Sequence, residues 1–305
     1  MRVLTFNMQN LRLRRRGGRN RLDGARDLDE EGGGEGAEPA LDYADRRLTA
    51  DVLALADADL CALQEVFDRA ALDYFHDHLL RATGVAPWPW RACLPGNDGA
   101  GRDVAVMARR PFAATGHARL LPGDLGLADA PGMRPGRPVF CRDCLMVDLG
   151  VLTLFTVHFK APWPDRAEAW ARRRAEALAV RHLIARRFTD PARALWLVAG
   201  DLNDPLADTD RAVAPLIGSF GVDLTERMPE GERWTWWHAE GARGCPDAML
   251  ASPALAARWP QAVPRAIRVG MGREAGGVQP RLPEVGNHRP HASDHAALVL
   301  DLPGL

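Results

Sequence analysis

Polar side chains stand at the ends of several short apolar runs, and their types suit chemistry at a metal ion. Five of them follow such runs: Asn7, Glu65, His158, Asp201 and Asn203. Three more precede the last two runs: Asp247, Asp294 and His295. Carboxylate and amide oxygens are the ligands that Mg²⁺ and Mn²⁺ prefer. Two histidines beside such an ion suit the negative charge that develops during attack on a phosphate.

The same residues fit hydrolysis by an activated water. Asp201 can orient and deprotonate the water, and Asp247 can hold His295 in one tautomer. A Ser–His–Asp hydrolase is the competing class of enzyme, but the sequence contains no G-x-S-x-G elbow. Ser293 stands directly before Asp294 and His295, which is too close in sequence for a normal triad. Metal-assisted attack on a phosphoester is therefore favoured.

These residues can share one site only if their strands run in both directions. In a parallel sheet, residues that follow a strand and residues that precede one lie at opposite edges. An antiparallel strand begins where its neighbours end. Asp247 and the pair Asp294-His295 therefore join the other residues at one rim if their strands are antiparallel. The spacing predicts a mixed α/β sheet.

The elements that would position these residues alternate along the chain. Short apolar runs predict strands at 3–6, 60–64, 104–108, 144–149, 151–157, 195–199, 248–251 and 297–302. Gly150 stands between two of these runs, as a tight hairpin turn requires. Apolar residues three and four apart predict helices at about 43–56, 68–82 and 165–188, the last with Asp165 as its N-cap.

Two Gly-rich segments interrupt this pattern. Residues 12–40 contain seven arginines by Arg26 and then become acidic, which predicts a flexible insertion. Its basic half could contact substrate, although its acidic half could equally neutralise that charge. Residues 270–291 form a Gly/Pro-rich loop that leads into Ser293. Because strands on both sides of each segment belong to one core, residues 1–305 are predicted to form a single domain.

The overall charge excludes some functions and leaves others open. The chain has 39 Lys+Arg and 40 Asp+Glu, a net charge of −1, and its one lysine is Lys160. Charge alone therefore cannot drive binding to nucleic acid, and any such contact must come from a local patch. No apolar run approaches the roughly 20 residues of a membrane span, and no signal peptide is recognised. We expect a cytoplasmic monomer with no protein partner.

Cysteine and tryptophan clusters each allow two interpretations. Cys141 and Cys144 form a CxxC that could bind zinc or carry out redox chemistry, but zinc would need a second ligand pair and none has matching spacing. Free thiols in a reducing compartment are the favoured interpretation. Trp234, Trp236 and Trp237 could stack on a base or a lipid, but packing in the core is favoured. Alternation along a strand would place Trp234 and Trp236 on one face.

Five short motifs in this order resemble the endonuclease/exonuclease/phosphatase superfamily of DNase I-like phosphoesterases. They are Leu4–Asn7, Leu63–Val66, His158–Lys160, Gly200–Asp204 and Ser293–His295. The segments 101–111, 234–237 and 246–252 also resemble this family. The resemblance implies a four-layer α/β sandwich, in which two mixed β-sheets pack face to face with helices outside.

The resemblance also implies a role for each motif residue. Glu65, Asn7 and Asp294 would form the Mg²⁺ or Mn²⁺ site, which holds one or two ions. Asp201 and Asn203 would position the nucleophilic water and contact the phosphate, and His295 would act on that phosphate, oriented by Asp247. His158 would stabilise the transition state or assist the leaving group. The proposed substrate-binding residues are Arg102, Arg142 and Lys160, although surface placement is the ordinary fate of a single arginine in this chain.

Two positions depart from the family pattern. Gln9 stands where abasic-site endonucleases commonly carry Asp, so a second metal ligand there is not expected. Pro246 replaces an aliphatic residue before Asp247. The sequence thus predicts a metal-dependent phosphodiesterase or nuclease acting on a phosphoester, with a nucleic acid or a nucleotide as a candidate substrate. The alternatives are a phosphatase, a phospholipid or inositol-phosphate hydrolase, and a non-catalytic binding module on the same fold.

Overall fold

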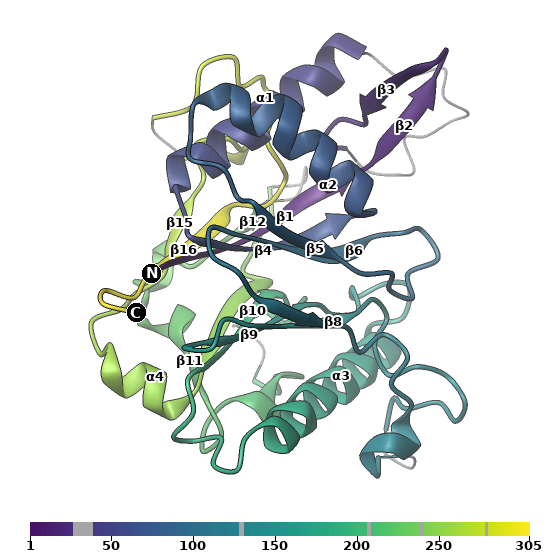
Figure 1. The fold of residues 1–305 in the computed structure, drawn as a ribbon, viewed down its shortest axis with the longest axis vertical. Coiled ribbons are helices and arrows are strands. Elements are labelled where there is room, and N and C mark those ends of the chain that lie inside the picture. Colours follow the sequence, from purple (N-terminus) through teal and green to yellow (C-terminus); the bar gives the residue numbers. More distant parts are fainter. Residues whose placement is uncertain (27–38, 128–130, 206–208, 238–240, 278–279) are drawn as a thin grey trace.

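Two six-stranded sheets form the centre of the protein, and helices lie against their outer faces (Figure 1). The computed structural model describes residues 1–26, 39–127, 131–205, 209–237, 241–277 and 280–305. The first sheet contains, in spatial order, β15 (Arg265–Ile267), β16 (Ala297–Asp301), β1 (Arg2–Leu11), β4 (Leu60–Val66), β6 (Asp103–Ala108) and β5 (Trp90–Cys93). The second contains β11 (Val222–Asp223), β14 (Asp247–Ala251), β10 (Trp196–Asp201), β9 (Thr153–His158), β8 (Cys144–Asp148) and β7 (Ala113–Thr115).

Both sheets are mixed, as the placement of the polar residues required. In the first sheet, β1 pairs in parallel with β4 and antiparallel with β16. In the second sheet, β10 pairs in parallel with β9 and antiparallel with β14. The predicted α/β sandwich of two mixed sheets is therefore confirmed. All eight predicted strands are present, and within the two central sheets the four strands that the sequence pattern missed, β5, β7, β11 and β15, are short.

Alternate residues along each strand pack into different layers, because successive side chains point to opposite faces. Val3 and Leu60 lie in the cluster between the two sheets, together with Leu154 and Leu197 of the second sheet. The next residue of β1, Leu4, lies in the cluster beneath the helices instead. Strands that are covered on both faces have nearly continuous apolar sequences. This is why short uninterrupted apolar runs were reliable signals here.

The helices complete the outer layers. Helices α1 (Pro39–Ala56) and α2 (Arg69–Phe75) cover the first sheet, and α3 (Arg166–Arg187) covers the second (Figure 1). A short helix, α4 (Pro253–Arg258), follows β14. The predicted helix at 68–82 is α-helical only as far as Phe75, and a π-helical turn and a 3₁₀ turn continue it to Thr83. Asp165 is the N-cap of α3, as predicted, and accepts a hydrogen bond from the Glu168 amide.

The segment 12–40 contains more regular structure than its composition indicated. Strands β2 (Leu13–Arg16) and β3 (Arg19–Leu22) form a hairpin at its start, and α1 begins at Pro39. Residues 27–38 lie outside the described residues. Leu22 is buried against the core, which anchors a hairpin that the arginine-rich sequence concealed. The described residues of 270–291 are irregular apart from a 3₁₀ turn at Arg273–Ala275.

The alternation expected for the tryptophans is wrong. Trp234 and Trp237 pack against the same small cluster around Met271, whereas Trp236 reaches the side chain of Asp294. The reason is that the short strand β12 (Trp236–Trp237) begins after Trp234, so Trp234 does not follow the pleat. Strand β12 pairs with β13 (Arg243–Gly244).

All five cysteines are free thiols, as expected. Cys144 is buried and Cys141 is half-buried. None of the helices in the described part of the chain combines the length and apolar character needed to cross a bilayer.

Candidate active site

The sheet register places three of the predicted residues side by side. Asp201 ends β10, and its neighbours across the sheet are His158 at the end of β9 and Asp247 at the start of β14. Gly200 allows this close approach, because a Cβ atom there would lie 1.9 Å from the carbonyl oxygen of Val157. The Gly-Asp pair of the sequence motif therefore has a steric cause.

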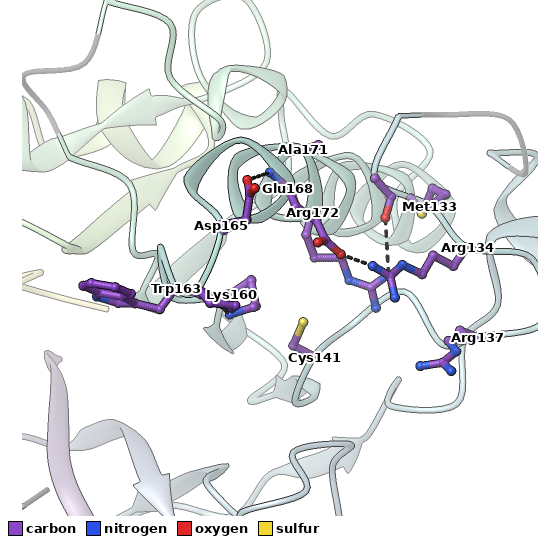
Figure 2. A pocket seen from close by; sticks show the side chains of 13 residues that line it. Met133, Arg134, Arg137, Cys141, Lys160, Trp163, Asp165, Glu168, Ala171 and Arg172 are labelled. Carbon is purple, nitrogen blue, oxygen red and sulfur yellow. Dashed lines mark hydrogen bonds and ion pairs between the residues drawn. The ribbon is translucent and has the colours of Figure 1, made fainter. Parts of the chain in front are cut away.

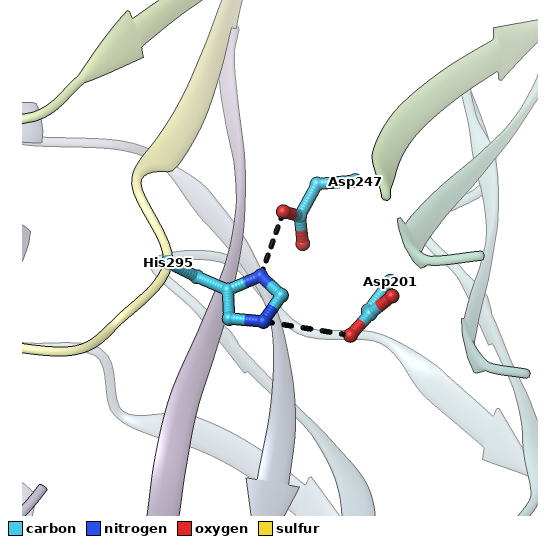
Figure 3. Close-up of side chains that lie close together, drawn as sticks. All are labelled: Asp201, Asp247 and His295. Carbon is cyan, nitrogen blue, oxygen red and sulfur yellow. Dashed lines mark hydrogen bonds and ion pairs between the residues drawn. The ribbon is translucent and has the colours of Figure 1, made fainter. Parts of the chain in front are cut away.

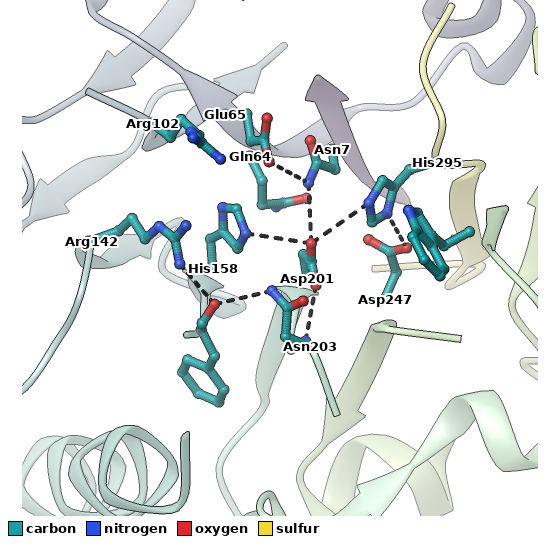
Figure 4. Close-up of polar contacts among 12 residues, drawn as sticks. Asn7, Gln64, Glu65, Arg102, Arg142, His158, Asp201, Asn203, Asp247 and His295 are labelled. Carbon is teal, nitrogen blue, oxygen red and sulfur yellow. Dashed lines mark hydrogen bonds and ion pairs between the residues drawn. The ribbon is translucent and has the colours of Figure 1, made fainter. Parts of the chain in front are cut away.

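Asp201 also connects the two sheets. Its Oδ2 atom accepts a hydrogen bond of 3.1 Å from Nδ2 of Asn7, which belongs to β1. Its Oδ1 atom accepts a hydrogen bond of 2.9 Å from the backbone amide of Asn203. Both contacts fix the carboxylate between the strand ends (Figure 4). The fixed orientation leaves Oδ2 facing both histidines.

The two histidines lie on either side of this carboxylate. Nε2 of His158 lies 3.4 Å from Oδ2 of Asp201, and Nε2 of His295 lies 3.9 Å from the same oxygen. On its other side, Nδ1 of His295 lies 2.8 Å from Oδ2 of Asp247 (Figure 3). Because the Asp247 carboxylate is an acceptor, Nδ1 of His295 carries the proton in this pair.

Burial and charge shift the pKa values of these groups in different directions. Burial raises the pKa of Asp201 to about 7, although His295 opposes this shift. Burial lowers the pKa of His158 well below its ordinary value, and the positive charges of Arg142 and His295 lower it further. Burial would also lower the pKa of His295, but Asp247, Asp294 and Asp201 raise it well above its ordinary value. At neutral pH, the site therefore holds a neutral His158 and a protonated His295.

Glu65 lies at the edge of this group, beside Asn7. Its Oε1 atom accepts a hydrogen bond of 3.2 Å from Nδ2 of Asn7, and its Oε2 atom accepts one of 3.0 Å from the amide of Asn10. Glu65 and Asn10 both have positive φ values, of 59° and 60°. Such φ values are uncommon outside glycine and cluster at functional sites.

The buried guanidinium of Arg46 supports the backbone at this edge. It donates hydrogen bonds to five carbonyl oxygens, those of Met8, Gln9, Asn10, Asp23 and Gly24. Burial lowers the pKa of Arg46 to about 10, although nearby carboxylates oppose the shift. The carbonyl groups of Met8, Gln9 and Asn10 near the end of β1 thus receive hydrogen bonds from a buried side chain.

Asp294 reaches the site through a different set of contacts. Its Oδ2 atom accepts a hydrogen bond of 3.1 Å from Nε1 of Trp236, and its amide donates one of 3.1 Å to Oε1 of Gln9. The hydroxyl of Ser293 donates to the carbonyl oxygen of Asn7 at 2.8 Å. These contacts join the loop before β16 to the end of β1.

The donor atoms present here fit a divalent cation. Asn7, Glu65 and Asp294 supply carboxylate and amide oxygens, the donor set of a hard cation such as Mg²⁺. Among the described residues, one group of His, Cys, Asp and Glu ligand atoms lies within 4.8 Å of one another: Asp201, Asp247 and His295. Within that group, Oδ1 of Asp247 is buried without a hydrogen-bond donor in the described structure. A buried oxygen of this kind is costly unless a cation or water satisfies it.

Arg102 and Arg142 lie on the side of His158 away from His295, and their guanidinium groups point toward His158 (Figure 4). Asp98 lies between them, with an oxygen 3.8 Å from Nε of each arginine. Nη1 of Arg142 donates to the carbonyl oxygen of Phe159 at 2.9 Å, and Nδ2 of Asn203 donates to the same oxygen at 3.1 Å. The predicted substrate residues Arg102 and Arg142 are therefore placed at the group around Asp201.

Lys160 is placed differently from what the sequence indicated. A strand that continued past His158 would point the side chain of Lys160 to the same side as His158. Strand β9 ends at His158, however, so the pleat does not continue to Lys160. Nζ of Lys160 donates to the carbonyl oxygens of Ala161 and Trp163. The side chain lines a separate pocket beside α3 (Figure 2).

Sequence reasoning missed Glu176, which organises this part of the site. Its buried carboxylate accepts hydrogen bonds from the amide of Cys141 at 2.8 Å and from the amide of Lys160 at 2.9 Å. It therefore ties together the segments that carry Arg142 and His158. A signal was present, because Glu176 falls on the same helix face as the buried residues Val180 and Ile184. An acidic residue on the apolar face of a helix needs a buried partner.

Comparison with known proteins agrees with this geometry. The profile of the Endonuclease/Exonuclease/phosphatase family matches residues 4–295. Among curated proteins, no sequence matches this chain significantly.

Several solved structures have the same fold. Humanized TDP2 from D. rerio, carrying 14 mutations, is 19% identical, with 98% of this chain and 97% of that chain covered and a TM-score of 0.58. An endonuclease/exonuclease/phosphatase from Beutenbergia cavernae is 16% identical, with 98% and 70% covered and a TM-score of 0.58. The 3'-5' exonuclease from Neisseria meningitidis is 18% identical, with 99% of each chain covered and a TM-score of 0.55. The family match extends over nearly the whole sequence, from the first strand to His295, and on this basis the chain belongs to the Endonuclease/Exonuclease/phosphatase family.

Proposed function

We propose that this protein is a divalent-metal-dependent phosphodiesterase that uses an activated water for in-line attack. The observation that carries the proposal is the buried position of Asp201 between His158 and His295, with Asp247 behind His295. Membership of the family supports phosphoester hydrolysis as the general class of reaction.

Asp201 would position and deprotonate the water. Its raised pKa brings the carboxylate closer to the operating pH, where a general base is most effective. Hydrogen bonds from Asn7 and the Asn203 amide fix the carboxylate, so the orientation of the water is set before substrate binds. Preorganised groups of this kind lower the barrier without rearranging during the reaction.

The two histidines would have distinct roles. Protonated His295, held by Asp247, would stabilise negative charge that develops on the phosphate oxygens. Neutral His158 would lie beside the same phosphate, and its Nδ1 atom is buried without a hydrogen-bond partner in the described structure. Arg142 and Arg102 would bind the phosphate oxygens that do not react.

The metal ion would be held by Glu65, with Asn7 and Asp294 completing the oxygen donors from the protein. When bound, it would polarise the phosphoryl oxygen and stabilise the leaving oxygen. Since the chain has no net positive charge, this cation would also supply attraction for an anionic substrate.

A nucleic acid is the substrate class that we favour within this activity. The structural relatives include D. rerio TDP2 in a complex with single-strand DNA product, at 16% identity and a TM-score of 0.53. The relative from Neisseria meningitidis is a 3'-5' exonuclease. Both support a nucleic-acid substrate by similarity of fold.

The test is a hydrolysis panel with Mg²⁺ or Mn²⁺ and with EDTA. The substrates are bis(p-nitrophenyl) phosphate, p-nitrophenyl phosphate, a DNA oligonucleotide, sphingomyelin and an inositol polyphosphate. We expect chelator-sensitive turnover of the diesters, with little turnover of p-nitrophenyl phosphate. If purified protein turns over none of these substrates with either metal, the proposal is wrong. Preferential turnover of p-nitrophenyl phosphate would identify a phosphatase instead.

A further inference from the structure

A pocket of about 510 Å³ opens beside the N-terminal end of α3 (Figure 2). One wall is formed by residues of the loop 132–141, and the other by residues between Lys160 and Arg172. Arg172 joins the two walls, because its guanidinium donates to the carbonyl oxygens of Gly132 and Pro138. The pocket is therefore shaped by contacts within the protein.

Glu176 connects the two walls of this pocket, and each wall continues along the chain to a residue of the candidate active site. Its carboxylate binds the amides of Cys141 and Lys160, one on each wall. Cys141 directly precedes Arg142, and Lys160 follows His158 by two residues, at most about 7 Å along the chain. A substrate whose reacting phosphate lies at His158 and Arg142 can therefore extend into the pocket without a long gap.

The charge of the lining favours an anion. Four cationic residues, Arg134, Arg137, Lys160 and Arg172, line the pocket, with two acidic residues, Asp165 and Glu168. Both acids already have partners, because Asp165 caps α3 and Glu168 pairs with Arg134.

Two of the cations keep donors for a ligand. Within the described residues, no carboxylate pairs with the exposed Arg137. The ammonium of Lys160 donates to two carbonyl oxygens, which leaves one of its three N–H groups for a ligand.

An aromatic ring completes the pocket. Trp163 is 74% exposed, the highest value among the large hydrophobic side chains of the described structure. Exposed indole costs free energy in water, and here it stands at the rim of a cationic pocket (Figure 2). An aromatic face beside positive charge is the arrangement by which proteins bind single-stranded nucleic acid, with a base on the ring and phosphates on the cations.

We infer that this pocket binds the single-stranded nucleic acid next to the reacting phosphodiester, with a base stacked on Trp163 and a phosphate at Arg137 and Lys160. The inference rests on the proposed function, because it names a substrate class for that site. A membrane surface is disfavoured as the occupant, since a membrane would require a convex apolar face and this site is hollow.

Binding can be measured without catalysis. Fluorescein-labelled hexathymidylate is titrated with protein in EDTA, and the dissociation constant is read from fluorescence anisotropy at several salt concentrations. We expect Trp163→Ala to weaken binding about tenfold, the size of one lost base stack. Arg137→Gln should weaken binding and reduce the slope of log K against log salt by about 0.7, the value for one phosphate contact on a single strand.

Matched variants control for surface changes elsewhere. Trp90, 39% exposed on β5, and Arg265, exposed on β15, lie outside the pocket lining. Trp90→Ala and Arg265→Gln should keep the dissociation constant within about twofold. In parallel, sedimentation with phosphatidylserine/phosphatidylcholine vesicles tests the membrane alternative.

The outcomes separate this inference from the proposed function. If Trp163→Ala and Arg137→Gln both bind hexathymidylate as tightly as wild type, the inference that this pocket binds nucleic acid is wrong. This holds even if the enzyme hydrolyses bis(p-nitrophenyl) phosphate. Loss of vesicle binding by Trp163→Ala, with hexathymidylate binding intact, overturns it in favour of a membrane. Conversely, absence of all metal-dependent hydrolysis counts against the proposed function. The anisotropy measurement still tests whether the pocket binds single-stranded nucleic acid.

Discussion

Nδ1 of His295 lies 2.8 Å from Oδ2 of Asp247, although the two residues stand 48 positions apart and adjoin strands of different sheets. His295 precedes β16 of the first sheet, and Asp247 begins β14 of the second. Both side chains are buried. Packing of the two sheets therefore completes the pair, and a change in that packing would separate the imidazole from its partner.

Replacing Asp247 should change how activity depends on pH. Asp247 raises the pKa of His295, so Asp247→Asn should lower that pKa. If activity needs protonated His295, the fall of kcat/KM at high pH should begin at a lower pH in the variant. At neutral pH we expect a loss of about 10²-fold, the range of general acid–base effects. The control is Asp301→Asn, which changes an exposed carboxylate on β16. An unshifted high-pH limb in Asp247→Asn would show that the pair does not set the protonation of His295.

Asp201→Asn should separate activity from stability. We expect kcat/KM to fall about 10³-fold, because Asn cannot accept the proton from water. The fold should survive, since Asn has the same shape as Asp, removes a buried carboxylate and keeps one side-chain oxygen that can accept the hydrogen bond from the Asn203 amide. Activity equal to wild type would contradict the assignment of Asp201 as the base.

The stability of this variant should also depend on pH. Because burial raises the pKa of Asp201, the folded protein favours its protonated form. The wild type should therefore lose stability relative to Asp201→Asn as pH rises from about 4, the unfolded pKa, through about 7. Thermal unfolding in EDTA measures this difference in Tm. A constant difference across that range would show that Asp201 is not perturbed.

Gly200→Ala should damage both the fold and the site. The added Cβ would lie 1.9 Å from the carbonyl oxygen of Val157, so β9 and β10 must move apart. We expect destabilisation of about 3 kcal/mol and a loss of activity, because the same strands carry His158 and Asp201. Denaturant unfolding measures the change. Gly150→Ala is the matched control, since its Cβ would meet no atom within 4 Å and only its positive φ carries a cost, about 1 kcal/mol.

Arg46→Met should be strongly destabilising. The variant leaves five buried carbonyl oxygens without their donor, and the cost should be about 3 kcal/mol or more. Arg46→Lys should recover only part of this loss, because an ammonium cannot match the planar set of donors. Denaturant unfolding of the two variants tests both expectations. A stability for Arg46→Met within 1 kcal/mol of wild type would show that the network contributes little.

Glu65→Gln should weaken the response to metal. We expect the Mn²⁺ or Mg²⁺ concentration for half-maximal activity to rise at least about tenfold, because the substitution removes the charge of the main oxygen donor. Saturating metal should restore part of the activity. Glu284→Gln, a change at an exposed carboxylate, serves as the control. An unchanged metal requirement in Glu65→Gln would place the ion elsewhere, with the Asp201–Asp247–His295 group as the next candidate.

The predictions from sequence succeeded where local pattern and strand position were sufficient. The strands buried on both faces were visible as apolar runs, and Asp165 was recognisable as the N-cap of α3. The requirement that Asp201 and Asp247 share one rim predicted a mixed sheet, and in the structure the strand after Asp247, β14, runs antiparallel to β10. Each of these inferences depends on residues that are close in sequence or on the edge of one sheet.

The predictions failed where long-range contacts decide the conformation. The arginine-rich residues Leu13–Leu22 form a hairpin because Leu22 is buried against the core, which composition cannot reveal. Lys160 turns away from His158 because β9 ends, and Glu176 holds the following segment by its backbone. Helix composition could only mark Glu176 as unusual, since its partners lie 16 and 35 residues away.

The order of amino acids alone was sufficient to identify the types of residues available for chemistry, their position at strand ends and the family resemblance. It also showed that net charge cannot explain binding of an anion. The packed structure adds that His295 meets Asp247 and that Lys160 lines a pocket beside α3. It also adds that burial lowers the pKa of His158, whereas the carboxylates around His295 raise the pKa of that residue despite its burial. The physical reason is that strand position follows from local periodicity, whereas distances and desolvation arise only when the two sheets pack together.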